Sequence, residues 1–316
     1  MTPRQRVALA FVARGGDLLL VQRSASAPIY PGRWTTVAGS VEAGEPPPAA
    51  AWRALAAELP VPVSFVAAGL PLDFSDTIKK RTVAFRIHPF LFQLDDEEPP
   101  DVCVGRWVAP DEIVMASATG ETIPELDEAL ARVWDPPAAL PPLYRDEARA
   151  IHADRQSSAR ALAVRAAALV AASAPPERVA ALRPALARLV NGARAAARPG
   201  RDVPHELELA ARAEARAVAS MVAGRRVAAV GPVPLPEDAT RVPVENADLT
   251  VVAAEAVLPR GDVVAHAGAV AAAEKRPVVV CTDAWAAWPD DLPPPLELGL
   301  ELLPRELIAR IIGAAN

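Results

Sequence analysis

Apolar and polar positions along residues 6–24 predict two strands joined by a tight turn. "RVALAFVARGGDLLLVQRS" alternates at first, then runs apolar after Gly15-Gly16-Asp17, which is typical of a β-hairpin. A loop punctuated by glycine and proline, "SAPIYPGRW", comes next, followed by a short strand, "TTVAG". The chain is therefore expected to begin with β-structure.

Two prolines delimit the first predicted helix. Proline is tolerated in the first turn of a helix, so the helix begins near Pro47 or Pro48, runs through "AAAWRALAAEL" and ends before Pro60. The later segments are a β-rich "RTVAFRIHPFLFQL", an acidic turn "DDEEPPD", a strand "CVGRWVA" and an amphipathic helix "IPELDEALARVW". This order predicts an α+β sandwich over residues 1–134.

The second half of the chain changes from a helical to a strand pattern. Residues 135–143, "DPPAALPPL", form a proline-rich linker and the best candidate boundary between domains. Residues 144–224 predict a helical cap that ends at Gly224. Residues 225–316 hold the buried-type strands "RRVAAVG", "DLTVVAAEAV" and "RPVVVCT", with the helix "GAVAAAEK" before the last. We expect a small α/β, Rossmann-like domain with a parallel sheet.

Composition narrows the class of protein. Hydrophobic residues make up 52% and charged residues 23% of the 316, which fits a globular chain of two domains. The net charge of −6 argues against binding to nucleic acid, and no apolar run suggests a membrane span or a signal peptide. Cys103 and Cys281 lie far apart, as in a reduced, cytoplasmic protein.

Residues 39–61, "GSVEAGEPPPAAAWRALAAELPV", carry a spaced motif. Matches to the pattern G-x5-E-x7-R-E-U-x-E-E-x-G-U, in which U is aliphatic, occur at Gly39, Glu45, Arg53, Leu55, Glu58 and Val61. The segment resembles the Nudix box, and the flanks "YPGRWTTVAGSVEAGE" and "WVAPDEI" agree with that family. The resemblance covers about residues 5–134 and implies a Nudix fold, in which the pair Glu45 and Arg53 ties the loop to the helix.

The metal chemistry of the family is largely missing from this helix. Carboxylates at positions i, i+3 and i+4 share one helix face and can together hold Mg²⁺, which activates water against a diphosphate. Here those positions are Ala54, Ala57 and Glu58. Glu58 is the candidate catalytic and metal-binding residue if the protein is active, with Glu42 as a weaker one. Other carboxylates that could stand in are Asp73, Asp76 and those of "DDEEPPD", although a solvated hairpin tip is the favoured explanation of that turn.

Several groups suited to an anionic ligand remain near the motif. Arg23, Arg33 and Arg53 offer guanidinium groups for phosphate, and the indole of Trp34 could stack on a base. The alternative is that Trp34 fills the core and the arginines are surface charges. His88, which precedes Pro89 on a predicted strand, is expected to be a satisfied edge histidine rather than a ligand.

Residues 150–316 resemble the initiation factor 2B regulatory subunits and the related sugar-phosphate isomerases. The resemblance rests on "RPALARLVN" and on "DLTVVAAEAVLPRGDVVAHAGAVAAAEKRPVVVCTDAW". It implies a catalytic cysteine on a phosphate loop with an aspartate partner, whereas this chain has no such loop and carries Glu255 at the aspartate position. Cys281 reads as a small buried side chain. Isomerase activity is not expected.

The sequence leads to three hypotheses about function. In the first, both folds are kept for binding a nucleotide or sugar phosphate, with little or no catalysis. In the second, a metal-dependent Nudix hydrolase cleaves a substrate linked to a nucleoside diphosphate, with Mg²⁺ as cofactor. In the third, the protein is an assembly factor that forms a homodimer through its C-terminal domain, an expectation that comes from the family resemblance alone.

Overall fold

The computed structural model describes residues 4–94, 105–288 and 300–312. The chain divides into two compact units, Met1–Ala139 and Leu140–Asn316. None of the helices in the described ranges is long and apolar enough to cross a membrane.

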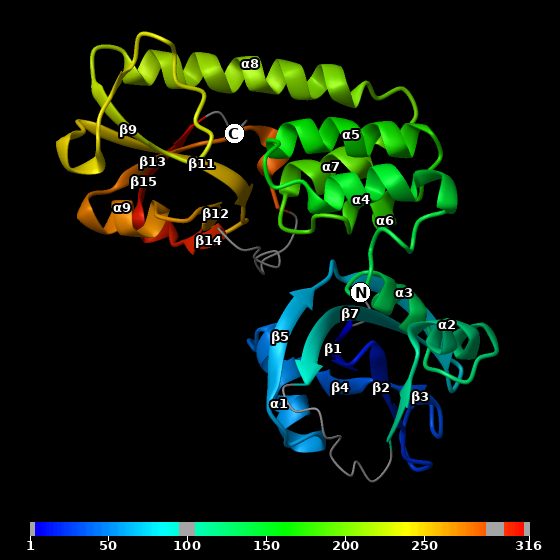
Figure 1. Cartoon of the computed structure of the whole chain (residues 1–316). Coiled ribbons are helices and arrows are strands. Elements are labelled where there is room, and N and C mark those ends of the chain that lie inside the picture. Colours follow the sequence, from blue (N-terminus) through cyan, green and yellow to red (C-terminus); the bar gives the residue numbers. More distant parts are fainter. Residues whose placement is uncertain (1–3, 95–104, 289–299, 313–316) are drawn as a thin grey trace. The chain divides into compact units, whose positions relative to one another are not determined.

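In the described residues of the first unit, helices pack around a sheet (Figure 1). Its elements are β1 Gln5–Arg14, β2 Asp17–Gln22, β3 Trp34–Thr35, β4 Val37–Ser40, α1 Pro47–Glu58, β5 Val63–Ala68, β6 Leu72–Ile78, β7 Arg81–Leu94, β8 Gly105–Val108, α2 Pro110–Ala118 and α3 Leu126–Ala131. The predicted hairpin of β1 and β2, the helix that begins at Pro47 and the long strand β7 are confirmed. The strands β5 and β6 and the helix α2 were not predicted.

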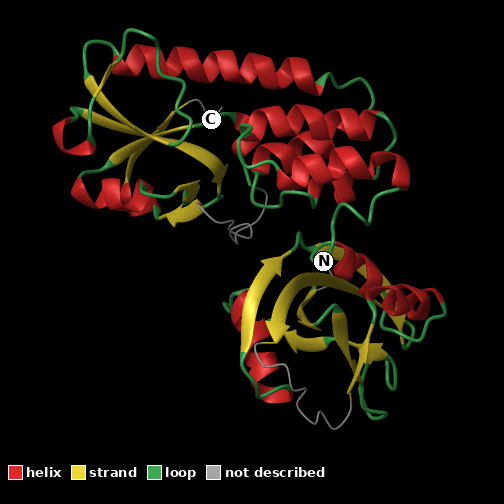
Figure 2. Ribbon diagram, in the orientation of Figure 1, coloured by secondary structure: helices red, strands yellow, loops and turns green. Residues whose placement is uncertain are grey.

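Alternation along β1 explains why the sheet of the first unit has helices on both faces. Ala8, Ala10 and Val12 pack on the side of α1, in one hydrophobic cluster. Leu9 and Phe11 belong to a second cluster with residues of α2 and α3. Because successive side chains of a strand point to opposite faces, this one strand supports both halves of the core. Figure 2 shows the helices on either side of the sheet. The result is the predicted α+β sandwich.

The strand β7 lies inside the sheet and not at its edge. It pairs with β1 in parallel and with β5 and β6 antiparallel. The prediction that His88 is a satisfied edge histidine is therefore wrong. His88 is buried, and among the described residues its Nε2 has no hydrogen-bond partner. Burial, together with the charges of Arg6 and Arg86, lowers the pKa of His88 to about 3.

The second unit has a helical part followed by a sheet. Its elements are η1 Pro142–Tyr144, α4 Arg145–Ala153, α5 Ala159–Ala171, α6 Pro176–Ala180, α7 Ala187–Ala196, α8 Val203–Val222, β9 Arg226–Val230, β10 Thr240–Arg241, η2 Val244–Asn246, β11 Leu249–Val257, β12 Val263–His266, α9 Ala269–Lys275, β13 Val278–Cys281, η3 Ala284–Ala286, β14 Leu300–Leu303, η4 Arg305–Leu307 and β15 Ile308–Ile312.

The sheet of the second unit is mixed, so the prediction of a parallel sheet is wrong in part. Strands β9, β11, β13 and β15 are parallel neighbours. However, β12 is antiparallel to β11, and β14 is antiparallel to β12. The register of β11 with β12 shifts between Ala254 and Ala256, where a bulge redirects the strand. The first part of β11 thus pairs with β13 and its last part with β12.

Two helices cover opposite faces of this sheet. Val251 and Ala253 of β11 pack with Val218 and Val222 of α8. The alternate residues of β11 pack with α9. Figure 1 shows α8 and α9 on the two sides of the strands. The buried-type strands expected from the sequence are therefore covered on both faces, as their continuous apolar runs require.

Candidate functional site

A bidentate ion pair fixes the loop before α1 to the helix. Arg53 donates from Nε to Glu45 Oε1 at 3.0 Å and from Nη2 to Glu45 Oε2 at 2.8 Å. The same Nη2 donates to the carbonyl of Ser40 at 2.8 Å, and the backbone N–H of Glu42 donates to Glu45 Oε2 at 2.9 Å. These bonds lower the pKa of Glu45 to about 2. Arg53 is thus committed to the loop rather than directed at a ligand.

Gly39 is required by the close approach of α1 to β4. A Cβ atom at this position would lie 3.0 Å from the carbonyl oxygen of Ala50 and 3.0 Å from the Cβ atom of Ala54. Gly39 and Ala54 therefore meet in a tight contact between the strand and the helix. In this chain the position of the first family carboxylate is a buried methyl group that packs against the sheet.

The remaining acidic groups near the helix do not form a set of metal ligands. Ala57 is exposed and has no donor atom, and Glu58 is the acidic residue of that face. Glu42 is mostly solvent-exposed, with a carboxylate oxygen 4.0 Å from Arg53 Nη2. Within residues 4–94, 105–288 and 300–312, no group of three or more His, Cys, Asp or Glu side chains could hold a metal ion. One carboxylate is a poor match for Mg²⁺, which gives up its water reluctantly.

The other carboxylates proposed as substitutes have different partners. Asp73 lies 3.5 Å from Arg4 and 3.8 Å from Arg86. Asp76 accepts a 2.8 Å hydrogen bond from the hydroxyl of Tyr30. Burial, together with that bond, raises the pKa of Tyr30 well above its ordinary value. The turn "DDEEPPD" lies outside the described residues, as does Cys103.

A pocket of about 290 Å³ opens beside Glu58. The polar residues that line it are Gln22, Arg23, Ser24, Thr35, Thr36 and Glu58. Burial raises the pKa of Glu58, and the charge of Arg23 opposes that shift. Glu42 does not line this pocket, so the structure does not bring the two predicted metal ligands together there.

The two threonines of the pocket differ in their hydrogen bonding. Thr36 Oγ1 donates to the carbonyl of Ala10 at 2.6 Å. Thr35 is also buried, yet its Oγ1 has no hydrogen-bond partner among the described residues. A buried hydroxyl without a partner is costly, and Thr35 is one of the residues that line the pocket. Thr35 was not predicted as a site residue. Its place in "TTVAG" shows that it precedes the motif, but the sequence does not show that it lines a pocket.

Arg23 faces the pocket, whereas Arg33 and Trp34 do not line it. Arg23 donates from Nε to the carbonyl of Ile29 at 3.1 Å, which leaves its Nη groups for other contacts. Arg33 Nη1 donates to the carbonyl of Thr122 at 3.1 Å. Trp34 packs against the core, and the guanidinium of Arg106 lies 4.6 Å from its ring centroid. This geometry favours a structural role for Trp34 and Arg33.

In the second unit, Glu255 belongs to a buried network of charges. Its Oε1 is 3.0 Å from Nε2 of His266, and its Oε2 is 3.8 Å from Arg188 Nη1. Arg188 donates from Nε to Asp283 Oδ2 at 3.1 Å, and Arg160 Nη2 bridges Asp283 and Glu214 at 2.8 and 2.7 Å. Burial opposes ionisation of Asp283, but Arg188 and Arg160 outweigh it and hold the pKa of Asp283 below its ordinary value.

Arg188 was missed as a functional or structural residue because it reads as one more arginine of a helix. Its partner Asp283 lies 95 positions further along the chain. Cys281 is fully buried, and burial together with Glu214 raises the pKa of its thiol well above the ordinary value. A thiol in that state is a poor nucleophile. This agrees with the interpretation of Cys281 as a small buried side chain.

A comparison with family models matches residues 3–133 to the NUDIX domain. This match confirms the predicted Nudix fold of the first part of the chain. It does not extend into residues 140–316, so the resemblance of that unit to initiation factor 2B proteins stays a prediction. No curated protein matches the chain.

Several solved structures are similar to part of the chain. A NUDIX hydrolase from Nitrosomonas europaea is 18% identical, covering 40% of this chain and 86% of its own, with a TM-score of 0.32. DR0079 from Deinococcus radiodurans is 26% identical, covering 42% and 83%, with a TM-score of 0.32. The MutT protein from Methanosarcina mazei Go1 is 19% identical, covering 42% and 93%, with a TM-score of 0.33. These similarities add no argument about substrate or chemistry.

Proposed function

We propose that the Nudix domain of residues 3–133 binds a phosphorylated small molecule in the pocket between Arg23 and Glu58, without metal-dependent cleavage. The observation that carries this proposal is the combination of groups in that pocket. Arg23 supplies positive charge for a phosphate, Glu58 accepts hydrogen bonds from a ligand hydroxyl or amino group, and Thr35 offers a buried hydroxyl with no other partner among the described residues. A nucleotide or a sugar phosphate presents all of these complements.

The absence of cleavage follows from the donor set of the helix. Ala54 and Ala57 provide no side-chain oxygen ligands, and the carboxylates of Glu42 and Glu45 lie beside Arg53. A site of this kind does not supply the negative field that holds a divalent cation against water. In the family, that cation supplies the activated water, and this chain has no described group arranged to replace it.

Titration calorimetry with ADP and with UDP-glucose, in EDTA and in Mg²⁺, tests the proposal. We expect binding that does not depend on Mg²⁺. Arg23→Gln should weaken it about tenfold, because a charged hydrogen bond is lost. Arg81→Gln removes an exposed arginine outside the pocket and should leave the affinity unchanged.

Thr35→Val provides a sharper test of the same pocket. The substitution keeps the shape of the side chain and removes the hydroxyl that lacks a partner. It should weaken ligand binding while leaving the free protein at least as stable as the wild type. The proposal is wrong if no phosphorylated probe binds, or if binding requires Mg²⁺ and releases phosphate.

The alternative is a Nudix hydrolase that cleaves a nucleoside diphosphate derivative with Mg²⁺ held by Glu58. One observation favours it, which is that Glu58 is retained at the family position and lines a pocket. It predicts Mg²⁺-dependent turnover that Glu58→Gln abolishes.

For the second unit we propose an assembly role. Its support is the resemblance of residues 144–316 to proteins that associate through this part of the chain, together with the buried state of Cys281 and Glu255, which leaves no accessible acid or nucleophile at those two positions. Light scattering at micromolar concentration tests it. A homodimer is the expected result, and a monomer would overturn this proposal without affecting the first one.

A further inference from the structure

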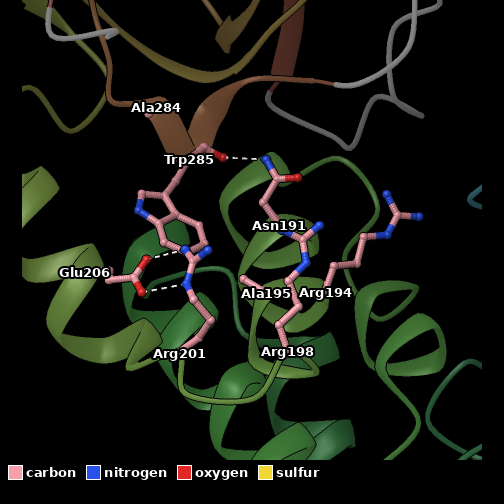
Figure 3. Close-up of a pocket in the computed structure, with 8 residues that line it drawn as sticks. All are labelled: Asn191, Arg194, Ala195, Arg198, Arg201, Glu206, Ala284 and Trp285. Carbon is pink, nitrogen blue, oxygen red and sulfur yellow. Dashed lines mark hydrogen bonds and ion pairs between the residues drawn. The ribbon is translucent and has the colours of Figure 1, made fainter.

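A hollow of about 600 Å³ lies on the helical side of the second unit (Figure 3). It is formed by the C-terminal half of α7, the loop to α8, the first turn of α8 and the short helix η3. The residues that matter for its chemistry are Asn191, Arg194, Arg198, Arg201, Glu206 and Trp285. This volume falls within the range of sites that bind small molecules. The hollow belongs to the second unit and shares no residue with the pocket beside Glu58.

The three arginines of the hollow are not equivalent. Arg194 pairs with Glu177 through two bonds of 2.9 and 2.8 Å. Arg201 pairs with Glu206, from Nε to Oε1 at 2.6 Å and also from Nη2 to Oε2. These two positive charges are therefore compensated within the protein.

Arg198 is the arginine of the hollow whose charge is not paired among the described residues. Among the described residues, its guanidinium has neither a hydrogen-bond nor an ion-pair partner. Figure 3 shows its side chain extending from the α7–α8 loop into the hollow, between Trp285 and Arg194. The hollow therefore has a net positive charge and one guanidinium free to bind an anion in a bidentate manner.

Trp285 forms a fixed apolar wall opposite Arg198. Its backbone N–H donates to Asp283 Oδ1 at 3.0 Å, and its carbonyl accepts from Asn191 Nδ2 at 2.8 Å. Part of the indole packs against a cluster that includes Leu207, and the guanidinium of Arg201 lies 5.8 Å from the ring centroid. The indole is thus held before any ligand arrives, which lowers the entropic cost of binding.

A free guanidinium beside a fixed indole suits a ligand that joins an anion to a flat ring. We infer that the hollow binds a nucleoside phosphate, with the phosphate on Arg198 and the base against Trp285. A single-stranded nucleic acid would use the same two contacts repeatedly. It would also need a continuous track of positive charge, whereas the net charge of this chain is −6 and the neighbouring arginines are already paired.

Calorimetry with GMP, ribose 5-phosphate and inorganic phosphate tests this inference on the full chain. All variants are made in an Arg23→Gln background, so that a site in the first unit contributes little. We expect GMP to bind more tightly than ribose 5-phosphate, because the base adds contact with the indole. Arg198→Gln should weaken GMP binding about tenfold, a loss of one charged hydrogen-bonding group.

Two further variants serve as a control and as a test of the contact between the base and the indole. Arg260→Gln, an exposed arginine of the same unit that does not line the hollow, should leave GMP binding unchanged. Trp285→Leu should abolish the preference for GMP over ribose 5-phosphate, and thermal unfolding shows whether that variant is folded. If Trp285→Leu is unfolded, the affinities of GMP and of ribose 5-phosphate are compared in Arg198→Gln and in its parent, the Arg23→Gln protein. That comparison shows whether the base contributes to binding.

Three outcomes would overturn the inference. One is equal GMP affinity in Arg198→Gln and Arg260→Gln. Another is inorganic phosphate binding as tightly as GMP, which would leave Trp285 no role. The third is a short oligonucleotide that competes far better than GMP, which would assign the surface to nucleic acid instead.

Discussion

The two units of this protein both keep arginine–carboxylate pairs, but in opposite surroundings. In the first unit, Arg53 and Glu45 meet at the surface, where Arg53 remains about half exposed. In the second, Arg188 is almost completely buried with Asp283 and Glu255. The arginine–carboxylate pair therefore has a different role in each unit. At the surface it sets the shape of a loop, whereas in the interior it neutralises charges that have lost their contact with water.

The physical reason is solvation. An exposed pair gains little, because water and salt screen the attraction and the side chains lose freedom. A buried pair has given up its hydration, so removing one member leaves the other uncompensated in the interior. Loss of the pair between Arg53 and Glu45 should therefore cost little stability, whereas loss of Arg188 should cost much more.

Arg188→Met is expected to have the largest effect on stability. It removes the buried cation that Asp283, Glu214 and Glu255 share, at a cost of about 3–5 kcal/mol. Urea unfolding of the second unit measures the loss. The matched control is Arg194→Met on the same helix, where the pair with Glu177 is partly exposed and the effect should stay below about 1 kcal/mol. Equal midpoints for the two variants would contradict the comparison.

His88 is a titratable group buried inside the sheet of the first unit. Its pKa is about 3 when folded and near 6.5 when unfolded, so between these values the unfolded chain binds more protons. Stability from this residue is complete above pH 6.5 and falls as the pH drops toward 3. At pH 5 the loss should be about 2 kcal/mol.

Denaturant unfolding of the wild type and of His88→Phe at pH 7 and pH 5 measures this dependence. The variant should lose less stability than the wild type between the two pH values. If both lose the same amount, His88 is not the source of the acid sensitivity.

Gly39→Ala tests whether packing holds α1 in place. The added methyl group would meet Ala50 and Ala54 at 3.0 Å, and helix and strand must separate slightly. We expect a loss of about 1 kcal/mol, at the low end for overpacking. Ala57→Ser, on the exposed face of the same helix, serves as the control in thermal unfolding. A Gly39→Ala protein as stable as this control would show that the contact is loose.

Arg53→Gln should have the smallest effect on stability, because the pair with Glu45 is exposed. The consequence that can be measured is a change in the pKa of Glu45. The pKa of Glu45, about 2 in the folded protein, should return toward 4.5. In the wild type, the stability that this shift contributes is present above pH 4.5 and is lost as the pH falls toward 2. NMR titration of the Glu45 side chain checks this, and an unchanged pKa would show that Arg53 is not its cause.

Much of the first unit could be predicted from the sequence, because local signals fix its elements. Pro47 and Pro60 bound α1, and the turn at Gly15-Gly16 fixes the first hairpin. The strand β6 was missed although "LDFSDTI" alternates in burial, since its period-2 signal is interrupted by polar residues on both faces. The spaced motif also placed Gly39, Glu45 and Arg53 correctly relative to one another.

The second unit was less predictable, because its main features depend on distant residues. Strand patterns do not give strand direction, so the antiparallel pairing of β12 and β14 could not be read from them. The burial of Arg188 depends on Asp283 and on the carbonyl of Ala254, both far along the chain. The free guanidinium of Arg198 became visible only after its neighbours were found to be paired.

The central claim concerns the helix α1, where two methyl groups stand at the positions of metal-binding carboxylates. The most direct test is an assay of phosphate release from a broad panel of nucleoside diphosphate derivatives, with Mg²⁺ and with Mn²⁺, using wild-type protein and Glu58→Gln. We predict no metal-dependent release above the protein-free blank for either protein. Release by the wild type that disappears in Glu58→Gln would contradict the account.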